Sequence, residues 1–223
     1  MLVHDFLENS ATRSPDKVAL VCSGRRLTYR QIEEDANRVA NGLSAAGVRR
    51  GDRVAIWLPN SVEIVLAIFG ILKAGATFVV VNATTKADKL AYVLGNCEGT
   101  CLFGPGRHAE EVVRLLETVP PLSLGILCGK AAREGAELRD DMQPFAELLA
   151  SSPAGRPKCE AIDLDLACLI YTSGSTGDPK GVMSTHANVV FAASSIIEYL
   201  ENVPDDIVIN VLPLSFDYGL YQL

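Results

Sequence analysis

Helical and strand-like spacings of apolar residues follow one another along the chain. In the segment LTYRQIEEDANRVANGLSAAG, apolar side chains recur at helical spacing from Ile32 to Leu43. Thr28 and Gln31 have the spacing of a capping box at the start of this helix, and Gly47 is placed to end it. We therefore expect a helix with one apolar face.

The next segments predict a strand, a helix and a second strand with short connections. The apolar run RVAIWLP stops at Pro59 and is typical of a buried strand. Ser61 can cap a helix from Val62 to Lys73, with Gly75 closing it, and TFVVVN is a β-branched run that favours another buried strand. Strands joined through a helix in this way form parallel sheets.

The same alternation continues with a predicted helix at 86–94, a strand at TCLFG, an amphipathic helix at HAEEVVRLLETV and a strand at LSLGILCG. Residues 129–160 are mostly polar or rich in small residues and proline, with a short helix expected near Phe145 to Leu149. We interpret 129–160 as a linker or surface excursion.

After this linker, LACLIYTSG and KGVMS predict two strands, residues 185–200 a helix, and DIVINVLPLSFDYG opens with another apparent strand. The expected fold class is α/β, with mostly parallel sheets flanked by helices. We expect two parts: residues 1–160 as an N-terminal α/β subdomain with its linker, and 161–223 as the start of a second α/β subdomain. Because Leu223 follows directly on SFDYGLYQ, we expect the chain to be a fragment of a longer protein.

Composition narrows the class of protein. Of the 223 residues, 48% are apolar and 21% charged, as in soluble globular proteins. The formal net charge of −7 argues against a nucleic-acid partner, and no apolar run is long enough for a membrane span. The start MLVHDFLENS lacks the pattern of a secretory signal, so we expect a cytoplasmic protein.

The cysteines and histidines do not form a metal-binding pattern. Cys97 and Cys101 have no matching second pair, so we expect the six cysteines to be buried reduced thiols and assign no metal ligand. His186 stands at a predicted helix start, where we expect a polar surface or capping residue.

One loop concentrates candidate chemistry. Between the strand ending near Tyr171 and the strand starting near Gly181 lies TSGSTGDPK. Its glycines let successive N–H groups converge on an anion, its hydroxyls add donors, and its lysine adds a positive charge. The alternative is a solvated hairpin turn, since serine, threonine and glycine are ordinary turn residues. The loop is not a Walker motif, because glycine follows the lysine.

The segment YTSGSTGDPKGVMSTH resembles the signature loop of the AMP-forming adenylating superfamily, which includes acyl- and aryl-CoA synthetases, adenylation domains of nonribosomal peptide synthetases, and luciferases. The match is unbroken from Tyr171 to Val182. The upstream segments LTYRQIEEDANRVANGL and GDRVAIWLPNSVEIVLAIFGILKAGATFVVVN resemble early motifs of the same family. The resemblance covers nearly the whole chain and is weakest at 105–160.

This resemblance implies a two-step reaction that needs ATP and Mg²⁺. A carboxylate would attack the α-phosphate, giving an acyl-adenylate and pyrophosphate, and a thiol of coenzyme A or of a carrier protein's phosphopantetheine arm would then take the acyl group. Donors must hold the β- and γ-phosphates during this step. The residues expected to do so are Thr172, Ser173, Gly174, Ser175, Thr176, Gly177 and Lys180, with Thr172 and Lys180 as the catalytic candidates.

The segment LPLSFDYG suggests the acid substrate. Its Phe216–Asp217 pair resembles that of amino-acid-activating domains, where the aspartate pairs with the substrate ammonium, whereas the preceding Pro-Leu resembles CoA-forming relatives. We expect Phe216, Asp217 and Tyr218 to bind the substrate, because a desolvated aspartate between two aromatic residues needs a cationic partner. Asp217 as the cap of a following helix is the alternative.

Three functions remain open at this point. The first is an N-terminal part of a ligase that adenylates an amino acid. The second is an acyl- or aryl-CoA synthetase with a substrate that lacks the amine. The third is a fragment that binds a nucleotide without turnover, and we expect the 223-residue chain by itself not to complete adenylation.

Overall fold

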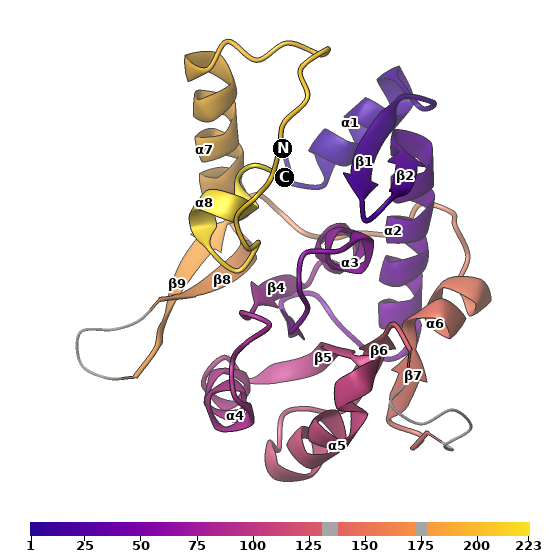
Figure 1. Cartoon of the computed structure of the whole chain (residues 1–223), viewed down its shortest axis with the longest axis vertical. Coiled ribbons are helices and arrows are strands. Elements are labelled where there is room, and N and C mark those ends of the chain that lie inside the picture. The colour runs from indigo at the N-terminus through magenta and orange to yellow at the C-terminus, as the bar shows by residue number, and fades with distance from the viewer. Residues whose placement is uncertain (131–137, 173–177) are drawn as a thin grey trace.

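The computed structural model describes residues 1–130, 138–172 and 178–223 of the chain. Within these residues, a seven-stranded sheet has the spatial order β7-β6-β5-β3-β4-β8-β9, and all neighbours are parallel except β8 and β9 (Figure 1). Its strands are β3 (Arg53–Ile56), β4 (Thr77–Val80), β5 (Gly99–Pro105), β6 (Leu124–Cys128), β7 (Met142–Pro144), β8 (Leu166–Thr172) and β9 (Lys180–Thr185). The expected α/β class with a mostly parallel sheet is confirmed.

Helices cover both faces of this sheet, and side chains that alternate along β3 separate the two layers. Val54 and Ile56 face the larger core, while Ala55 on the opposite face belongs to a second core. The larger core includes side chains of α1 (Asp5–Arg13), α2 (Tyr29–Ala45), α3 (Val62–Lys73) and α6 (Phe145–Ser151). The second core includes side chains of α4 (Ala87–Asn96) and α5 (Ala109–Thr118), which a short 3₁₀ turn, η1 (Gly106–His108), precedes.

The helix signals of the sequence are confirmed at atomic detail. Thr28 and Gln31 form both hydrogen bonds of a capping box at the start of α2. Ser61 accepts from the Ile64 amide at the start of α3, and Gly75 follows that helix with a φ of 77°. Local polar groups thus satisfy the free amides at helix ends, independently of the rest of the fold.

Two pairings were not expected. A two-stranded antiparallel sheet joins β1 (Val18–Cys22) and β2 (Arg25–Thr28) ahead of α2. Strand β7, inside the expected linker, pairs in parallel with β6 at the edge of the main sheet. Only Met142 of β7 is buried, so a short edge strand of this kind has little hydrophobic pattern to reveal it.

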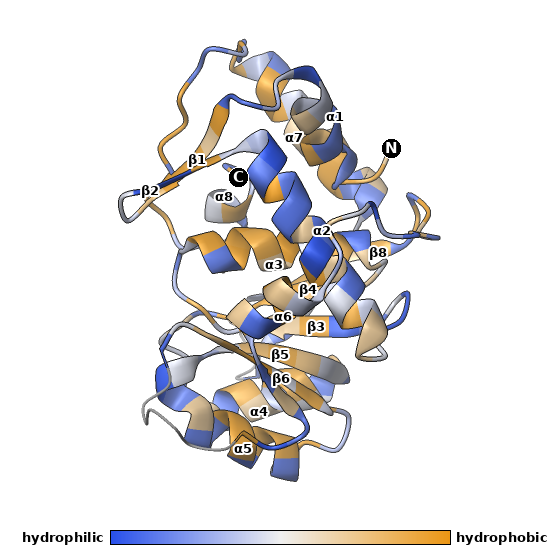
Figure 2. Ribbon diagram, turned by 90° about the vertical axis from the view of Figure 1, so that its right-hand side faces the viewer, coloured by the Kyte–Doolittle hydropathy of each residue, from blue (hydrophilic) through white to orange (hydrophobic). Residues whose placement is uncertain are grey.

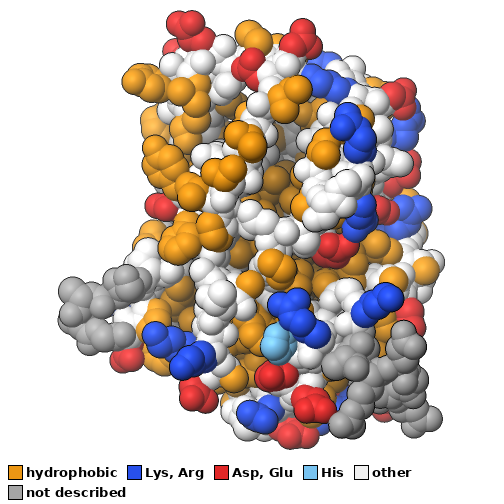
Figure 3. Space-filling model, in the orientation of Figure 1, with side chains coloured by type: hydrophobic (Ala, Val, Ile, Leu, Met, Phe, Trp, Pro, Cys, Tyr) orange, Lys and Arg blue, Asp and Glu red, His pale blue; other side chains and the backbone are white. Residues whose placement is uncertain are grey.

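The strand expected at the opening of DIVINVLPLSFDYG is wrong. Residues 206–211 have no strand partner in the described part of the chain, and the side chain of Ile207 is 96% exposed. A β-branched run forms a strand only where a neighbour offers hydrogen bonds and a surface to pack on. Figure 3 shows apolar side chains gathered on the surface over α7 (His186–Tyr199) and the segment that follows it.

The sheet is continuous across residue 160, where we expected the boundary between two parts. Strand β8 pairs in parallel with β4, so the hairpin of β8 and β9 extends the sheet built by the first 160 residues. The two-part division stays a prediction. The apolar residues of α3 and the parallel strands lie at the centre of the molecule (Figure 2). No helix in the described residues has both the length and the hydropathy to cross a bilayer.

Candidate active site

The β8–β9 hairpin places the two candidate catalytic residues opposite each other. Thr172 is the last residue of β8, Lys180 is the first of β9, and they are direct partners in the antiparallel register. Both side chains are exposed, so they are free to meet a ligand. The other predicted phosphate-binding residues, Ser173 through Gly177, lie outside the described residues.

Close packing next to this pair explains one glycine of the motif. Tyr171 pairs with Gly181 in the same register, and a Cβ atom on Gly181 would lie 3.1 Å from the Tyr171 ring. A side chain at Gly181 would therefore have to displace the ring that precedes Thr172. Burial, followed by the nearby Cys97 and Tyr92, raises the pKa of the Tyr171 phenol to about 12, so the phenol keeps its proton at neutral pH.

Thr172, where the predicted phosphate loop begins, lies at the carboxyl end of β8, on the edge of the sheet where the other parallel strands also end. Ligands of open α/β sheets bind outside this edge. Asn60, which follows β3 at the same edge, donates to the Leu212 carbonyl at 2.9 Å and accepts from the Leu214 amide at 3.0 Å. The segment that leads to Phe216 is therefore fixed to the edge from which the loop leaves. Asn60 lies in a segment that resembles an early family motif, but that resemblance did not predict this contact with residues far along the chain.

The predicted substrate-binding residues lie at helix α8 (Asp217–Leu220). Phe216 is its N-cap residue, and Phe216, Asp217 and Tyr218 are all exposed. Asp217 Oδ1 accepts from the Tyr218 amide at 2.8 Å. The argument that Asp217 is desolvated after a buried strand is therefore wrong for this chain, because neither the strand nor the burial is present. Its carboxylate is accessible to a ligand in solution.

Gly219 sets the position of α8. A Cβ atom on Gly219 would lie 2.3 Å from the Pro213 carbonyl oxygen, so the helix can contact that backbone only with glycine here. Asn210 donates to the Gly219 carbonyl at 2.9 Å, and Leu214 is buried in the larger core. These contacts hold the exposed Phe216–Tyr218 stretch on an otherwise weakly packed segment.

His186 is buried, and the expectation of a surface position is wrong. Its Nδ1 accepts from the Val3 amide at 3.1 Å, and its ring lies edge-on to His4 at 6.0 Å. Burial lowers the pKa of His186, and burial together with the positive charge of Lys73 lowers the pKa of His4 to about 4. Both rings are therefore neutral at pH 7 and join the N-terminus to α7.

A cavity of about 350 Å³ lies elsewhere, where α3 ends ahead of β4. The fully buried Lys73 ammonium is 2.6 Å from Glu8 and 2.7 Å from Glu33, and Arg156 pairs with the second oxygen of Glu8 at 2.6 Å. The lysine charge is thus compensated by residues of α1 and α2. We interpret this cluster as a structural connection between helices, and its residues do not overlap with those predicted for the site.

The six cysteines are free thiols, as expected, but the expectation that all are buried is wrong for Cys22 and Cys159, which are partly exposed. The buried ones are poor nucleophiles. Burial raises the pKa of Cys97 to about 11 and that of Cys168 to about 12, and it raises the pKa of Cys101 further. Thiols that stay protonated at neutral pH do not attack carbonyl or phosphoryl groups. They act as small core residues.

The sequence of this chain is similar to those of known proteins over most of its length. The family model described as AMP-binding enzyme matches residues 7–223. A linear gramicidin synthase of Brevibacillus parabrevis is 30% identical over the whole chain, which spans 4% of that protein. A medium/long-chain-fatty-acid–CoA/3-oxocholest-4-en-26-oate–CoA ligase of Mycobacterium tuberculosis (strain CDC 1551 / Oshkosh) is 33% identical over 84% of the chain and 34% of its own length.

Among solved structures, the anthranilate CoA ligase AuaEII in complex with anthranoyl-AMP superimposes with a TM-score of 0.78. The two are 28% identical, and the match covers 87% of this chain and 36% of that one. The chain therefore spans 34% and 36% of the length of the two CoA ligases and 4% of the length of the gramicidin synthase.

Proposed function

Because the chain belongs to the family of AMP-binding enzymes, we propose that it is the N-terminal part of a ligase that activates a carboxylic acid with ATP. The observation that carries the proposal is the pairing of Thr172 with Lys180 at the carboxyl edge of the sheet. A hydroxyl and a flexible cation are held side by side, next to a sequence that resembles the phosphate loop of this family.

In the proposed first step, a carboxylate oxygen of the acid attacks the α-phosphorus of ATP. The bond from that phosphorus to the bridging oxygen breaks, and pyrophosphate leaves with the electron pair. Lys180 and Thr172 would hold the β- and γ-phosphates, where negative charge grows. Mg²⁺ in such sites is bound largely through the phosphates, and we assign it no ligand from this chain.

In the proposed second step, a thiol attacks the acyl carbon of the adenylate and AMP leaves. The thiol belongs to coenzyme A or to a carrier protein's phosphopantetheine arm. The mycobacterial relative is a CoA ligase by name, which supports coenzyme A as the acceptor. The linear gramicidin synthase, which matches over the whole chain, is not named as a CoA ligase, and it supports the carrier-protein alternative. Both acceptors therefore remain in the proposal.

We further propose an amino acid as the substrate, with Asp217 pairing to its ammonium group. Asp217 is exposed, and its sequence neighbours Phe216 and Tyr218 are exposed aromatic residues that can contact the rest of the acid. A fatty or aromatic acid is the second candidate, supported by the named CoA ligases among the similar proteins.

ATP–pyrophosphate exchange by the natural full-length protein, with a panel of amino acids and their deaminated analogues, tests both proposals. Lys180→Ala should lower exchange about 100-fold or more, because a charged donor to the leaving phosphates is lost. Unchanged exchange would contradict the assignment of the loop. Asp217→Ala should reduce exchange with amino acids and spare the analogues, and equal wild-type activity on both would favour the second candidate.

The same assay on the 223-residue chain addresses the third possibility. We expect no exchange at enzymatic rates from this chain alone, and calorimetry with MgATP then tells whether it binds the nucleotide. Exchange at the rate of the natural protein would show that residues 1–223 suffice for adenylation.

A further inference from the structure

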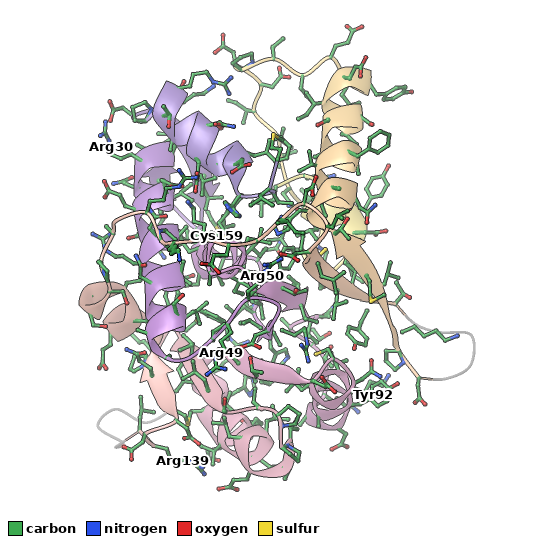
Figure 4. The ribbon with its side chains drawn as sticks, turned by 180° about the vertical axis from the view of Figure 1, so that it is seen from behind. Arg30, Arg49, Arg50, Tyr92, Arg139 and Cys159 are labelled. Atoms are coloured by element: carbon green, nitrogen blue, oxygen red, sulfur yellow. The ribbon has the colours of Figure 1, made fainter. Side chains whose placement is uncertain are left out.

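Helix α4 contacts the phosphate-loop hairpin on both sides of the loop. The Tyr171 hydroxyl, on the residue before Thr172, donates to Asn96 Oδ1 at 2.6 Å. The Tyr92 hydroxyl donates to the carbonyl of Pro179, the residue before Lys180, at 3.5 Å. Figure 4 shows Tyr92 on the side of α4 toward the hairpin.

These two contacts come from one face of one rigid element. Tyr92 and Asn96 are four residues apart, so they lie one above the other on the same side of α4. The opposite side of the helix carries Leu90 and Leu94, Val93 lies at the edge between the two sides, and all three are buried in the second core. A helix fixed in this way is a stable reference from which to position a loop.

The two contacts of α4 hold the residues directly next to Thr172 and Lys180. Thr172 and Lys180 already face each other across the hairpin, but both are exposed and neither is held by packing of its own side chain. The neighbours Tyr171 and Pro179 are only partly exposed. Fixing these neighbours therefore fixes where the backbone of the two candidate catalytic residues lies.

We propose that Asn96 and Tyr92 are positioning residues that hold the two ends of the phosphate loop in register with the sheet, so that Thr172 and Lys180 meet the β- and γ-phosphates together. This inference rests on the proposed function. Asn96 has the larger role, since its hydrogen bond is short, whereas that of Tyr92 is long and correspondingly weak.

The experiment compares binding of MgATP and of AMP to the natural full-length protein by calorimetry. AMP lacks the β- and γ-phosphates, so a defect in the loop ends should weaken MgATP selectively. Asn96→Leu removes the acceptor at similar size, and we expect MgATP to bind about tenfold more weakly with AMP affinity unchanged. Tyr92→Phe should weaken MgATP about twofold to threefold.

Two variants separate positioning from loss of structure. Asn96→Asp retains an acceptor for the Tyr171 hydroxyl and should bind MgATP as the wild type does. Tyr199→Phe removes a phenol from the far end of α7, where the side chain is 86% exposed, and should change neither affinity. The double variant Tyr171→Phe/Asn96→Leu should lose no more than Asn96→Leu alone, because both substitutions remove the same bond.

The outcomes distinguish a failure of the positioning role from a failure of the proposed function. If Lys180→Ala weakens MgATP while Asn96→Leu and Tyr92→Phe do not, the positioning role is wrong and the proposed function stands. If Asn96→Leu weakens MgATP and AMP equally, or Asn96→Asp fails to restore MgATP binding, the contact is merely structural. If Lys180→Ala itself binds MgATP normally, the assignment of the loop to the β- and γ-phosphates fails, and the positioning role fails with it.

Discussion

Helices α3 and α7 are both rich in apolar residues, yet they differ in what covers them. In α3 nearly every side chain is buried, including the terminal Lys73, whereas in α7 only His186 is buried. Phe191 on α7 is 75% exposed, and the apolar segment after α7 is exposed as well. Apolar composition therefore marks a surface that can be buried, and the tertiary contacts decide whether it is.

We expect the largest effect from a substitution in the buried ion cluster at the end of α3. Lys73→Ala leaves Glu8 and Glu33 facing each other without their shared cation, and we expect it to lower the free energy of unfolding by about 3 to 5 kcal/mol. Urea unfolding followed by circular dichroism measures this. Lys158→Ala, at an exposed pair with Glu160, is the matched control and should leave the midpoint unchanged.

Isoleucine truncation compares the two helices directly. Ile71 of α3 is fully buried, so Ile71→Ala should lower the free energy of unfolding by about 3 kcal/mol through lost burial and the cavity it leaves. Ile197 of α7 is exposed, so Ile197→Ala should cost less than about 0.5 kcal/mol. Equal losses in urea unfolding would mean that α7 is covered in solution.

The histidine contact between the N-terminus and α7 should make stability depend on pH. The pKa of His4 falls from 6.5 to about 4 on folding, so below pH 6.5 the unfolded chain binds a proton that the folded chain does not. The contribution of His4 to stability is fully present above pH 6.5 and declines as the pH falls toward 4, by about 2 to 3 kcal/mol at pH 4.5.

Comparing wild type with His4→Leu isolates this histidine from nearby groups that also respond to acid. The charged groups that act on His4 are Asp5, Glu8 and Lys73, and the neighbouring His186 has its own lowered pKa. The wild type should lose more stability than His4→Leu as the pH falls from neutral toward the folded-state pKa of His4. Parallel pH profiles would contradict the lowered pKa of His4.

The smallest effect concerns the attachment of α8. Asn60→Ala removes both hydrogen bonds to the Leu212–Leu214 backbone, and we expect faster amide exchange there, equivalent to about 1 kcal/mol, with little change in global stability. Asn41→Ala is the matched control, because Asn41 donates to the Pro153 and Gly155 carbonyls instead. Faster exchange at α8 in the control would show that the effect is not local.

Local signals made much of the fold predictable. Thr28 and Ser61 cap their helices as expected because each cap depends only on residues three positions away. The buried parallel strands were recognisable because both faces are apolar. Strand β7 was not, since it is short and lies at an edge, and residues 206–211 were mistaken for a strand because β-branched residues alone do not supply a neighbour.

The sequence by itself predicted most helices and strands of the main sheet, although not β7, and it predicted a phosphate-binding role for the loop between Thr172 and Lys180, because these signals come from nearby residues. Only the tertiary structure decided that His186 is buried against the N-terminus, that Asn60 holds the segment before α8, and that Asn96 accepts from Tyr171. Each of these contacts joins residues far apart in the chain. Single polar residues carry no periodicity or motif that predicts such partners.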